Sequence, residues 1–514
     1  MRAVKNLMRS VGARAARALA SKLVDPAYYL ARNGDVAAAG MDPTEHFARY
    51  WHHPPVRSPN ARAEPWIFAL APLFALGLRA AGRDRADVLD YLRQRINDIS
   101  GENRPLQLRL CLAVARLLAR RPTPAVTAAL GRPLGVARVV SDRPSWIELT
   151  PIAEEGTLTF RDPPILPRSA PGTTRRIVVP ALWCATVRDA AVFGAAEVMA
   201  RDHLVVHEPA ADPRLRLATR QCNFVTNCYP ARSGRILARL PEAADQSLEH
   251  AILLGGRGGE NYFHFLIEYL TKGYVIERLT KLDGVPLLVS AELYPQEMEA
   301  LGRVLPGRPV IRRRTGARID VGTLHLPSVM SYVPDDPAIP FWRAAAANPD
   351  SLRWLRDRVL AGESAAVRKD IRIYLGRSGG RNIGNSEEVA ELFRRHGFVV
   401  VDPARLSFAE QVATFRTAAH IAGPVGAAFA NLVFASPGAR VMGIISPFAV
   451  QFSLFAHLAR FSGCTYDVLP GIRPDFRPGL EERRNPVSVT HGAFRVDIDY
   501  LERALGHFLA PQGS

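Results

Sequence analysis

Cysteine is rare in this chain of 514 residues, and its five cysteines form no Cys-x-x-Cys pair and have no histidine partner at zinc spacing. This pattern argues against a zinc finger or zinc ribbon, and it makes reduced thiols in a cytoplasmic protein the expectation. Cys222 and Cys228 are close enough in sequence to bridge in an oxidising compartment, but nothing else in the chain indicates export.

Long apolar runs are also lacking. Residues 66–78 form the apolar segment WIFALAPLFALGL, but its thirteen residues, with Pro72 inside, are too few for a membrane span. Such a span needs ~20 residues. We therefore predict a buried helix at 66–78 within a helical subdomain, and no membrane-spanning segment elsewhere.

Lysine is the third scarce residue, because only five of the 66 basic residues are lysine and the rest are arginine. The net charge of +17 suits anionic partners such as nucleic acid, acidic lipid headgroups, nucleotide diphosphates or acidic polysaccharide. Arginine in place of lysine throughout is also what a GC-rich coding bias produces. We therefore predict no nucleic-acid partner.

The first twenty residues place basic side chains among apolar ones and predict a basic amphipathic helix. No uninterrupted apolar core follows the charges, so the segment does not have the form of a signal peptide. Two interpretations stay open: peripheral attachment to the anionic inner face of a membrane, and an ordinary solvated first helix.

What the chain does contain is a run of short, continuous apolar segments between 371 and 445. They are bounded by Gly, Pro or Asp and lie at 371–375, 398–401, 420–422 and 441–445. Continuous apolar segments are typical of strands covered on both faces of a parallel sheet, and the stretches between them have a helical period. This region therefore predicts a doubly wound, Rossmann-like layer.

Ligands of open α/β sheets bind outside the carboxyl ends of the strands. The loop after the first predicted strand carries Arg377, Arg381 and Asn385, and arginine forks suit phosphate oxygens. The third strand leads into Gly423, Gly426 and Ala427, which open a helix containing Asn431. The free N–H groups of a helix start attract an anion. A tight turn without any ligand is an equally good interpretation of the glycines alone.

Three motifs in this region, YLGRSGGRNIGN, GFVVVDPARLSFAEQV and HIAGPVGAAFANLVFASPG, resemble the catalytic domain of glycosyltransferase family 61, of the bacterial capsular or exopolysaccharide type. The segment GGRGGENYFHFLIEYL (255–270) resembles a further motif of that family. The resemblance implies a GT-B architecture, in which two Rossmann-like domains face a cleft. It also implies sugar transfer with inversion from a nucleotide-sugar donor, which serves as co-substrate, with no other cofactor and no obligatory metal.

The resemblance places the chemistry on Glu268 and His264, which lie one turn apart on a predicted helix that starts near Asn261. We expect Glu268 to act as general base on an acceptor hydroxyl and His264 to be its hydrogen-bonding neighbour in the cleft. A structural carboxylate and a core histidine are the alternatives. Arg377, Arg381 and the helix start at Gly426 would hold the diphosphate in place of a metal.

An Asp-x-Asp pattern at Asp497 and Asp499 is the kind of sequence a metal-dependent transferase would use. It leads directly into a predicted C-terminal helix at 500–509, however, where helix capping explains it. We therefore predict no metal site.

Two positions depart from the family pattern, because Val425 stands where the family usually has histidine and Gly443 where it usually has an acidic residue. The leading hypothesis is a hexosyl- or pentosyltransferase of bacterial surface polysaccharide synthesis, which acts on a saccharide or lipid-linked saccharide acceptor. The alternative is a non-catalytic relative that binds polysaccharide or a partner enzyme. Residues 23–53 also resemble a module found at the ends of bacterial polysaccharide glycosyltransferases.

The expected fold is α/β and GT-B-like, preceded by a small α-helical N-terminal region. We expect a helical motif region at 1–60 and a helical subdomain at 61–135. An acceptor-side Rossmann-like domain would follow at 136–350, and a nucleotide-sugar domain at 351–514. The expected location is the cytoplasm, and peripheral attachment to the inner face of the membrane is one of the two interpretations of the basic N-terminus.

Overall fold

The computed structural model describes residues 24–50, 132–167, 172–208, 228–230, 236–238, 243–256, 258–259, 261–332, 346–363, 370–376, 383–480 and 492–510, with positions 21, 241, 340 and 342. Two compact units make up the chain. The first comprises Met1–Leu134, Ala218–Cys222 and Cys228–Arg239, and the second comprises Gly135–Leu217, Asn223–Asn227 and Leu240–Ser514. The predicted amphipathic helix at 1–20 and most of the predicted helical subdomain at 61–135 lie outside the described residues.

Three short helices form the described N-terminal part of the first unit: α2 (Pro26–Arg32), α3 (Gly34–Ala38) and α4 (Pro43–Tyr50). The Asp25 carboxylate accepts a hydrogen bond from the Tyr28 N–H at 3.0 Å, which caps α2. Tyr29, Val36 and Phe47 form a small core between the helices. The same unit contains the antiparallel pair β8 (Cys228–Pro230) and β9 (Ile236–Ala238).

The second unit begins with a large mixed sheet. Its strands in spatial order are β12 (Val310–Arg313), β11 (Leu287–Ser290), β10 (Gln246–Leu253), β13 (Ile319–Pro327), β5 (Leu182–Phe193), β6 (Glu197–Ala200), β7 (His203–Val206) and β1 (Arg132–Arg138), with β2 (Ile147–Ala153) paired to β5. The residues of β1 from Gly135 onward belong to this unit and pair with β7. The first four run parallel to one another, whereas β5 is antiparallel to β13, β2 and β6. Apolar segments of the sequence at 203–206, 251–254, 286–289, 310–311 and 323–326 correspond to β7, β10, β11, β12 and β13.

Shorter elements connect this sheet to the rest of the unit. They are the hairpin β3 (Gly156–Arg161) and β4 (Thr174–Val179), the helical turns η4 (His264–Tyr269), η5 (Leu270–Lys272) and η6 (Thr280–Leu282), the helices α9 (Gly273–Ile276), α10 (Pro295–Val304) and α11 (Pro349–Leu360), and the bridge between β14 (Ser331–Tyr332) and β15 (Ala346–Ala347).

A capping asparagine and a proline set the start of α11. The first helical residue of α11 is Pro349, and the side chain of Asn348 accepts from the N–H groups of Asp350 and Ser351 at 3.0 Å each. Proline has no N–H to donate, so it fits the first turn of a helix and ends any helix that would run through it.

The second sheet is wholly parallel. Its order is β17 (Phe398–Val401), β16 (Ile371–Leu375), β18 (Ala418–Pro424), β19 (Arg440–Ile445) and β20 (Thr465–Pro470). In chain order this is 2-1-3-4-5, so the strand order reverses between β16 and β18. A crevice outside the carboxyl ends of those two strands is where such sheets bind ligands.

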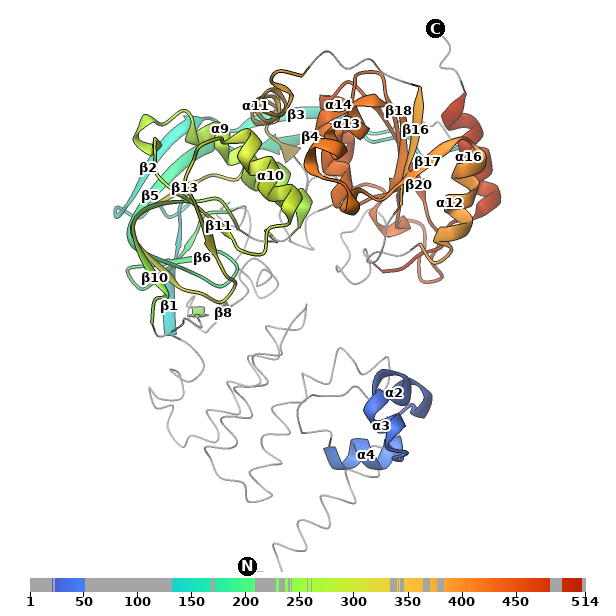
Figure 1. The fold of residues 1–514 in the computed structure, drawn as a ribbon, viewed down its shortest axis with the longest axis horizontal. Coiled ribbons are helices and arrows are strands. Elements are labelled where there is room, and N and C mark those ends of the chain that lie inside the picture. Colours follow the sequence, from blue (N-terminus) through green and yellow to red (C-terminus); the bar gives the residue numbers. More distant parts are fainter. Residues whose placement is uncertain are drawn as a thin grey trace, which may run out of the picture. The chain divides into compact units, whose positions relative to one another are not determined.

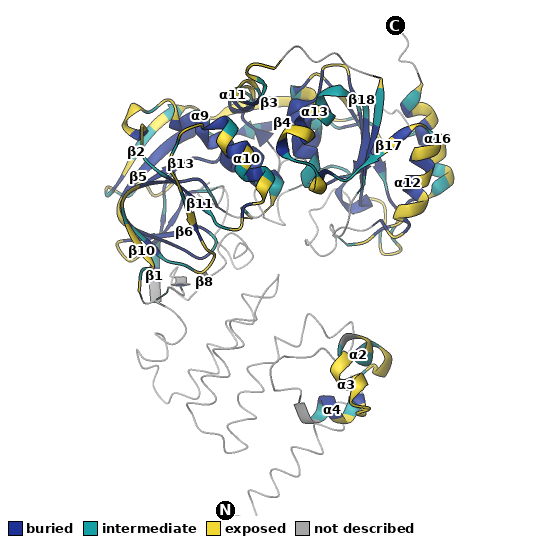
Figure 2. Cartoon of the chain, viewed as in Figure 1, coloured by how far each residue is buried: buried dark blue, intermediate teal, exposed yellow. Residues whose placement is uncertain are grey.

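Helices cover both faces of this second sheet (Figure 1). The helices α12 (Ser386–Arg395) and α16 (Ile498–Leu509) pack on one face, and α13 (Phe408–Thr417), α14 (Leu454–Phe461) and the 3-10 helix η9 (Ala427–Phe434) pack on the other. Short 3-10 turns lie at η8 (Pro403–Arg405) and η10 (Pro447–Ala449). The strands are buried, while α12 and α16 expose their outer faces (Figure 2). The prediction of a doubly wound α/β layer from 371 to 445 is therefore confirmed.

One apolar core runs through both halves of the second unit. It combines side chains beneath the first sheet, such as Leu266, Leu301 and Leu355, with side chains beneath the second, such as Val412 and Phe429. The α/β class is thus established for this unit, and the GT-B arrangement of two domains around a cleft stays an expectation. The helices among the described residues are all too short or too polar to cross a bilayer.

Candidate active site

The predicted catalytic segment winds as a π-helix, η4, and tightens into the 3-10 turn η5. It follows β10 through a glycine-rich loop, and the Phe265 N–H donates to the carbonyl of Asn261 at 2.9 Å where the helix begins. Single π turns are rare and occur frequently at functional sites. The expected helix is therefore present, with an irregular winding that residue spacing does not reveal.

His264 and Glu268 meet on one face of this helix. His264 Nδ1 lies 2.5 Å from Glu268 Oε2, and the Ser331 hydroxyl donates to Glu268 Oε1 at 2.6 Å. Glu268 is only 1% exposed, whereas 18% of the His264 side chain is accessible. Both carboxylate oxygens are thus engaged, and the Nε2 atom of His264 is the polar atom of this pair that a substrate can meet.

A buried lysine lies behind this pair. Lys272 is fully buried, its Nζ donates to the Gly255 carbonyl at 3.1 Å, and the ammonium lies 5.0 Å from the centre of the Tyr269 ring. Burial lowers the pKa of Lys272 to about 8, although the charges of Glu208 and Glu268 act in the opposite direction. Lys272 is therefore a cation at neutral pH.

The glycine loop at 255–259 packs directly against this cluster. A Cβ atom on Gly256 would lie 1.6 Å from Glu208 Oε1 and 2.8 Å from the Tyr269 ring. Gly258 has a φ of +65°, and a Cβ atom there would lie 3.0 Å from the His264 ring. Glycine is required at Gly258 both by the left-handed backbone and by this close approach.

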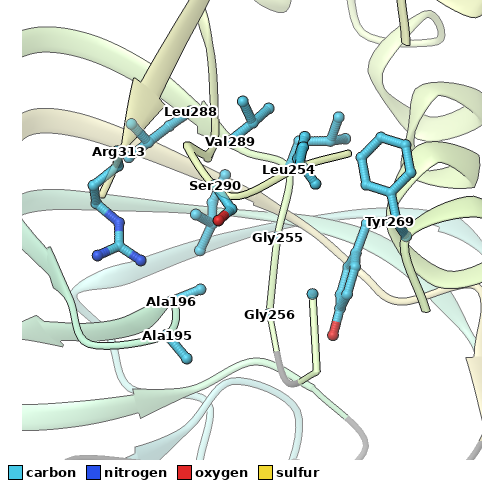
Figure 3. Close-up of a pocket in the computed structure, with 14 residues that line it drawn as sticks. Ala195, Ala196, Leu254, Gly255, Gly256, Tyr269, Leu288, Val289, Ser290 and Arg313 are labelled. Atoms are coloured by element: carbon cyan, nitrogen blue, oxygen red, sulfur yellow. The ribbon is translucent and has the colours of Figure 1, made fainter. Parts of the chain in front are cut away.

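A small cavity lies where β10, β11 and β12 end (Figure 3). It encloses about 20 Å³, room for about one water molecule. Ser290, Arg313 and Tyr269 supply its polar side chains, with the glycine loop between them. The Arg313 guanidinium also donates to the carbonyls of Arg314 and Ala317, at 3.2 and 3.1 Å. Arg313 therefore has a structural role in holding that turn.

The predicted donor-binding glycines lie at the carboxyl end of β18, beside the point where the strand order reverses. Gly423 is inside the strand, where a Cβ atom would lie 2.8 Å from the Leu375 Cβ, so glycine allows β18 to pack closely on β16. Gly426 precedes η9, which starts at Ala427, and the Phe429 N–H donates to the Gly426 carbonyl at 3.0 Å. The expected helix start is present as a 3-10 helix.

Asn431 is fully buried and connects three elements. Its Oδ1 accepts from the Tyr262 hydroxyl at 2.8 Å, and its Nδ2 donates to Gln411 Oε1 at 2.7 Å. Tyr262 stands at the start of the catalytic segment and Gln411 lies on α13. Asn431 therefore has a structural role, because its side chain links the catalytic segment to α13 through two hydrogen bonds.

Asn385 holds the chain before α16, because its side chain exchanges two hydrogen bonds with the backbone of Val496, at 2.9 and 3.0 Å. It also lines an open hollow of about 610 Å³, together with Glu388, Ile472 and Phe494. Small-molecule pockets commonly have this size. The other two predicted donor residues of this loop, Arg377 and Arg381, lie outside the described residues.

The two positions that depart from the family pattern lie side by side. A Cβ atom on Gly443 would lie 2.7 Å from a methyl carbon of Val425 and 2.3 Å from the Tyr466 hydroxyl. The buried Tyr466 ring thus occupies the space into which a side chain at 443 would extend. Burial and the nearby Asp467 both raise the pKa of Tyr466, so its hydroxyl stays protonated.

No group of three or more His, Cys, Asp or Glu side chains among the described residues has the geometry to hold a metal ion. The Asp497 carboxylate accepts from the Tyr500 N–H at 2.8 Å and caps α16, as its position in the sequence predicts.

Sequence reasoning did not identify Ser331, Lys272, Glu208 or Tyr262 as part of the site. Ser331 and Glu208 come from segments more than fifty residues away, so no local pattern could indicate them. Lys272 carried one signal, because it is one of only five lysines in an arginine-rich chain.

The catalytic segment lies within a stretch that matches a known protein family. Residues 262–442 match the family model described as Glycosyltransferase 61. The match starts at the catalytic segment and ends within β19, so it includes the His264–Glu268 pair and the glycine turn after β18. It supports that family, which implies transfer of a sugar from a donor to an acceptor substrate. No curated protein matches the chain.

Proposed function

We propose that the chain is an inverting glycosyltransferase that moves a hexosyl or pentosyl group from a nucleotide sugar to a saccharide or lipid-linked saccharide acceptor. The observation that carries this proposal is the pair formed by His264 and the buried Glu268 within the segment that matches the family model. Single-step inversion needs a group that takes the proton of the acceptor hydroxyl as it attacks the sugar, and this pair is such a group.

The contacts of the two residues support different tasks for them. Glu268 is engaged by His264 on one oxygen and by Ser331 on the other, so it holds the imidazole ring in place. His264 then accepts the acceptor's proton at Nε2, and the carboxylate stabilises the imidazolium that forms. Glu268 thus stays essential for catalysis, but His264, and not Glu268 as expected from the sequence, contacts the acceptor hydroxyl directly.

The donor would bind at the carboxyl ends of β16 and β18. The reversal of strand order there supports this position, as do the helix start at Gly426 and Ala427 and the hollow beside Asn385. Arg377 and Arg381, from the loop after β16, would neutralise the departing diphosphate without a metal ion. A role in surface polysaccharide synthesis at the inner membrane face is part of the same proposal and rests on the family resemblance and the basic N-terminus.

A non-catalytic relative that binds polysaccharide or a partner enzyme is the second candidate. Its support is the apolar contact of Val425, Gly443 and Tyr466, which stands where the family usually carries a histidine and an acidic residue.

The test begins with thermal shift against UDP, GDP, CMP and dTDP sugars, followed by a transfer assay with saccharide acceptors for any sugar that stabilises the protein. We expect one nucleotide to stabilise the protein and its sugar to be transferred with inverted anomeric configuration. Binding of saccharide without any response to nucleotide sugars would favour the second candidate.

A further inference from the structure

We propose that Lys272 is a positioning residue for the His264–Glu268 pair, and that its ammonium group both anchors the glycine loop and supplies the positive charge that keeps two neighbouring carboxylates ionised. This inference rests on the proposed function, because it concerns the same pair. In that proposal Lys272 contacts neither the acceptor nor the donor.

The Lys272 ammonium fixes the position of the glycine loop. The Lys272 side chain extends from η5 to the Gly255 carbonyl at 3.1 Å, which fixes the first residue of the glycine loop. The same loop abuts Glu208 at Gly256 and the His264 ring at Gly258. An ammonium that holds Gly255 therefore fixes the wall against which His264 is placed.

The charge of Lys272 also acts on two nearby carboxylates. Glu208 and Glu268 both act on Lys272 through their charges, and the Tyr269 hydroxyl donates to Glu208 Oε1 at 3.3 Å. Glu268 is buried and Glu208 is half-buried, and desolvation disfavours an ionised carboxylate unless a cation lies close to it. Among the described residues, Lys272 is such a cation for both.

Two further titratable groups near Lys272, a thiol and an imidazole, are neutral at neutral pH. Burial raises the pKa of the Cys184 thiol to about 11, and burial together with the charge of Lys272 lowers the pKa of His207 to about 3. Glu268 itself faces His264 on η4 and the Ser331 hydroxyl of β14. Among the described groups that face this cluster, Lys272 therefore supplies the fixed positive charge.

The experiment compares pH–rate profiles of the full chain with its best nucleotide sugar and acceptor. Lys272→Met keeps the length of the side chain and removes the charge, so the His264–Glu268 pair holds its proton more strongly. The acid limb of the profile, where the rate falls because the pair is protonated, therefore moves to higher pH. We expect a shift of about one pH unit or more, since an opposite charge at short range changes a pKa by about 1 to 3 units. Lys281→Met, which removes a half-exposed lysine paired with Glu148, is the matched control and leaves the limb in place.

Glu208→Gln provides an opposite test that does not depend on the folding of the lysine variant. It removes a negative charge near the pair, so the acid limb moves to lower pH, while the amide oxygen can still accept from Tyr269. A residue with only a structural role would lower kcat at every pH without moving the limb. An unmoved limb in both variants overturns the proposal.

A stability measurement separates this inference from the proposed function, because it needs no activity. The native pKa of Lys272 is lowered to about 8 from an ordinary 10.5, so unfolded chains bind the extra proton between these values. Stability of the wild type therefore rises with pH across this window relative to Lys272→Met. Equal pH dependence of the two melting temperatures would contradict the desolvated position of the Lys272 ammonium on which the proposal rests. If the difference appears but no nucleotide sugar is turned over, the proposed function has failed and the placement of Lys272 has not.

Discussion

At the scale of single residues, the arrangement around Glu268 determines how the chemistry can be tested. A carboxylate that is 1% exposed and has a hydrogen-bond donor on each oxygen is a support for its neighbour rather than a group that meets solvent. The sequence indicated Glu268 and His264 together, because four-residue spacing brings them to one helix face. It could not indicate which of the two is accessible, because accessibility depends on Ser331 and on the glycine loop.

The first prediction concerns Glu268→Gln, which keeps the size of the side chain and removes its charge. The imidazolium that forms on His264 then loses its stabilising partner, so kcat should fall by ~10² to 10⁴-fold. Affinity for the nucleotide sugar, measured by calorimetry, should change little. Glu297→Gln, a second substitution of a fully buried glutamate, is the control and should keep its turnover. Near-wild-type turnover of Glu268→Gln would remove the pair from the mechanism.

Glu297 itself is a carboxyl group in an unfavourable place. It is fully buried on α10, its Oε2 accepts from the Tyr294 N–H at 2.8 Å, and no described group hydrogen-bonds to its Oε1. Burial raises the pKa of Glu297 to about 7, and the hydrogen bond from Tyr294 opposes this change. The native state therefore holds a proton that the unfolded chain loses near pH 4.5.

The second prediction is a pH-dependent gain of stability in Glu297→Gln. Because the native pKa is raised, the wild type keeps its full stability below pH 4.5 and loses part of it as the pH rises through about 7. The variant does not titrate, so it should equal the wild type near pH 4.5 and exceed it by roughly 3 kcal/mol at pH 8. Urea denaturation at both pH values measures this difference. A constant difference across the range would contradict the burial of an uncharged Glu297.

At the scale of elements, one glutamate of α10 caps the N-terminus of α13. Glu299 of α10 accepts from the backbone N–H groups of Phe408 and Ala409 at 2.8 and 3.0 Å, at the first turn of α13. A carboxylate there satisfies two otherwise unpaired donors and interacts favourably with the helix dipole. This bond joins an element of the first half of the unit to one of the second.

The third prediction is that Glu299→Ala destabilises the second unit by ~1 to 2 kcal/mol, the usual cost of removing a charged cap. Chemical denaturation provides the measurement. Glu391→Ala is the matched control, because that side chain is 58% exposed and pairs with Arg394 on the surface of α12. Such a surface pair should contribute less than ~0.5 kcal/mol. Equal effects of the two substitutions would show that the cap contributes no more than a surface charge.

The strands and helices of the second sheet were the most predictable elements. The predicted strands at 371–375 and 398–401 are β16 and β17, because short apolar runs bounded by Gly, Pro or Asp have few other ways to be buried. β5 was missed, because Arg188 and Asp189 interrupt its apolar pattern and it lies antiparallel to its neighbours. The π winding of η4 was also missed, since it depends on tertiary packing and not on residue spacing.

At the scale of the whole molecule, the order 2-1-3-4-5 of the second sheet puts the glycine turn at Gly426 beside the carboxyl end of β16. The core that runs beneath both sheets of the second unit then connects this edge to the catalytic segment through Tyr262 and Asn431. The candidate donor and acceptor sites therefore belong to one continuous structure.

The fourth prediction concerns metal ions and the intact protein. If arginines and a helix start neutralise the diphosphate, saturating chelator should leave transfer activity within experimental error. The assay is transfer with and without EDTA, after dialysis against the chelator. Loss of turnover that Mn²⁺ or Mg²⁺ restores would refute metal independence.

The sequence by itself determined the α/β class of the C-terminal half, the helical position of His264 and Glu268, and the capping role of Asp497. Each of these depends on neighbours within a few residues, where period, apolar runs and capping residues leave few alternatives. Only the tertiary structure decided that Lys272, Glu208 and Ser331 gather around the pair and that Asn431 is a buried connection. It also decided that Gly443 faces Val425. These contacts join residues that are distant in sequence, and they follow from strand order and a shared core that no local pattern encodes.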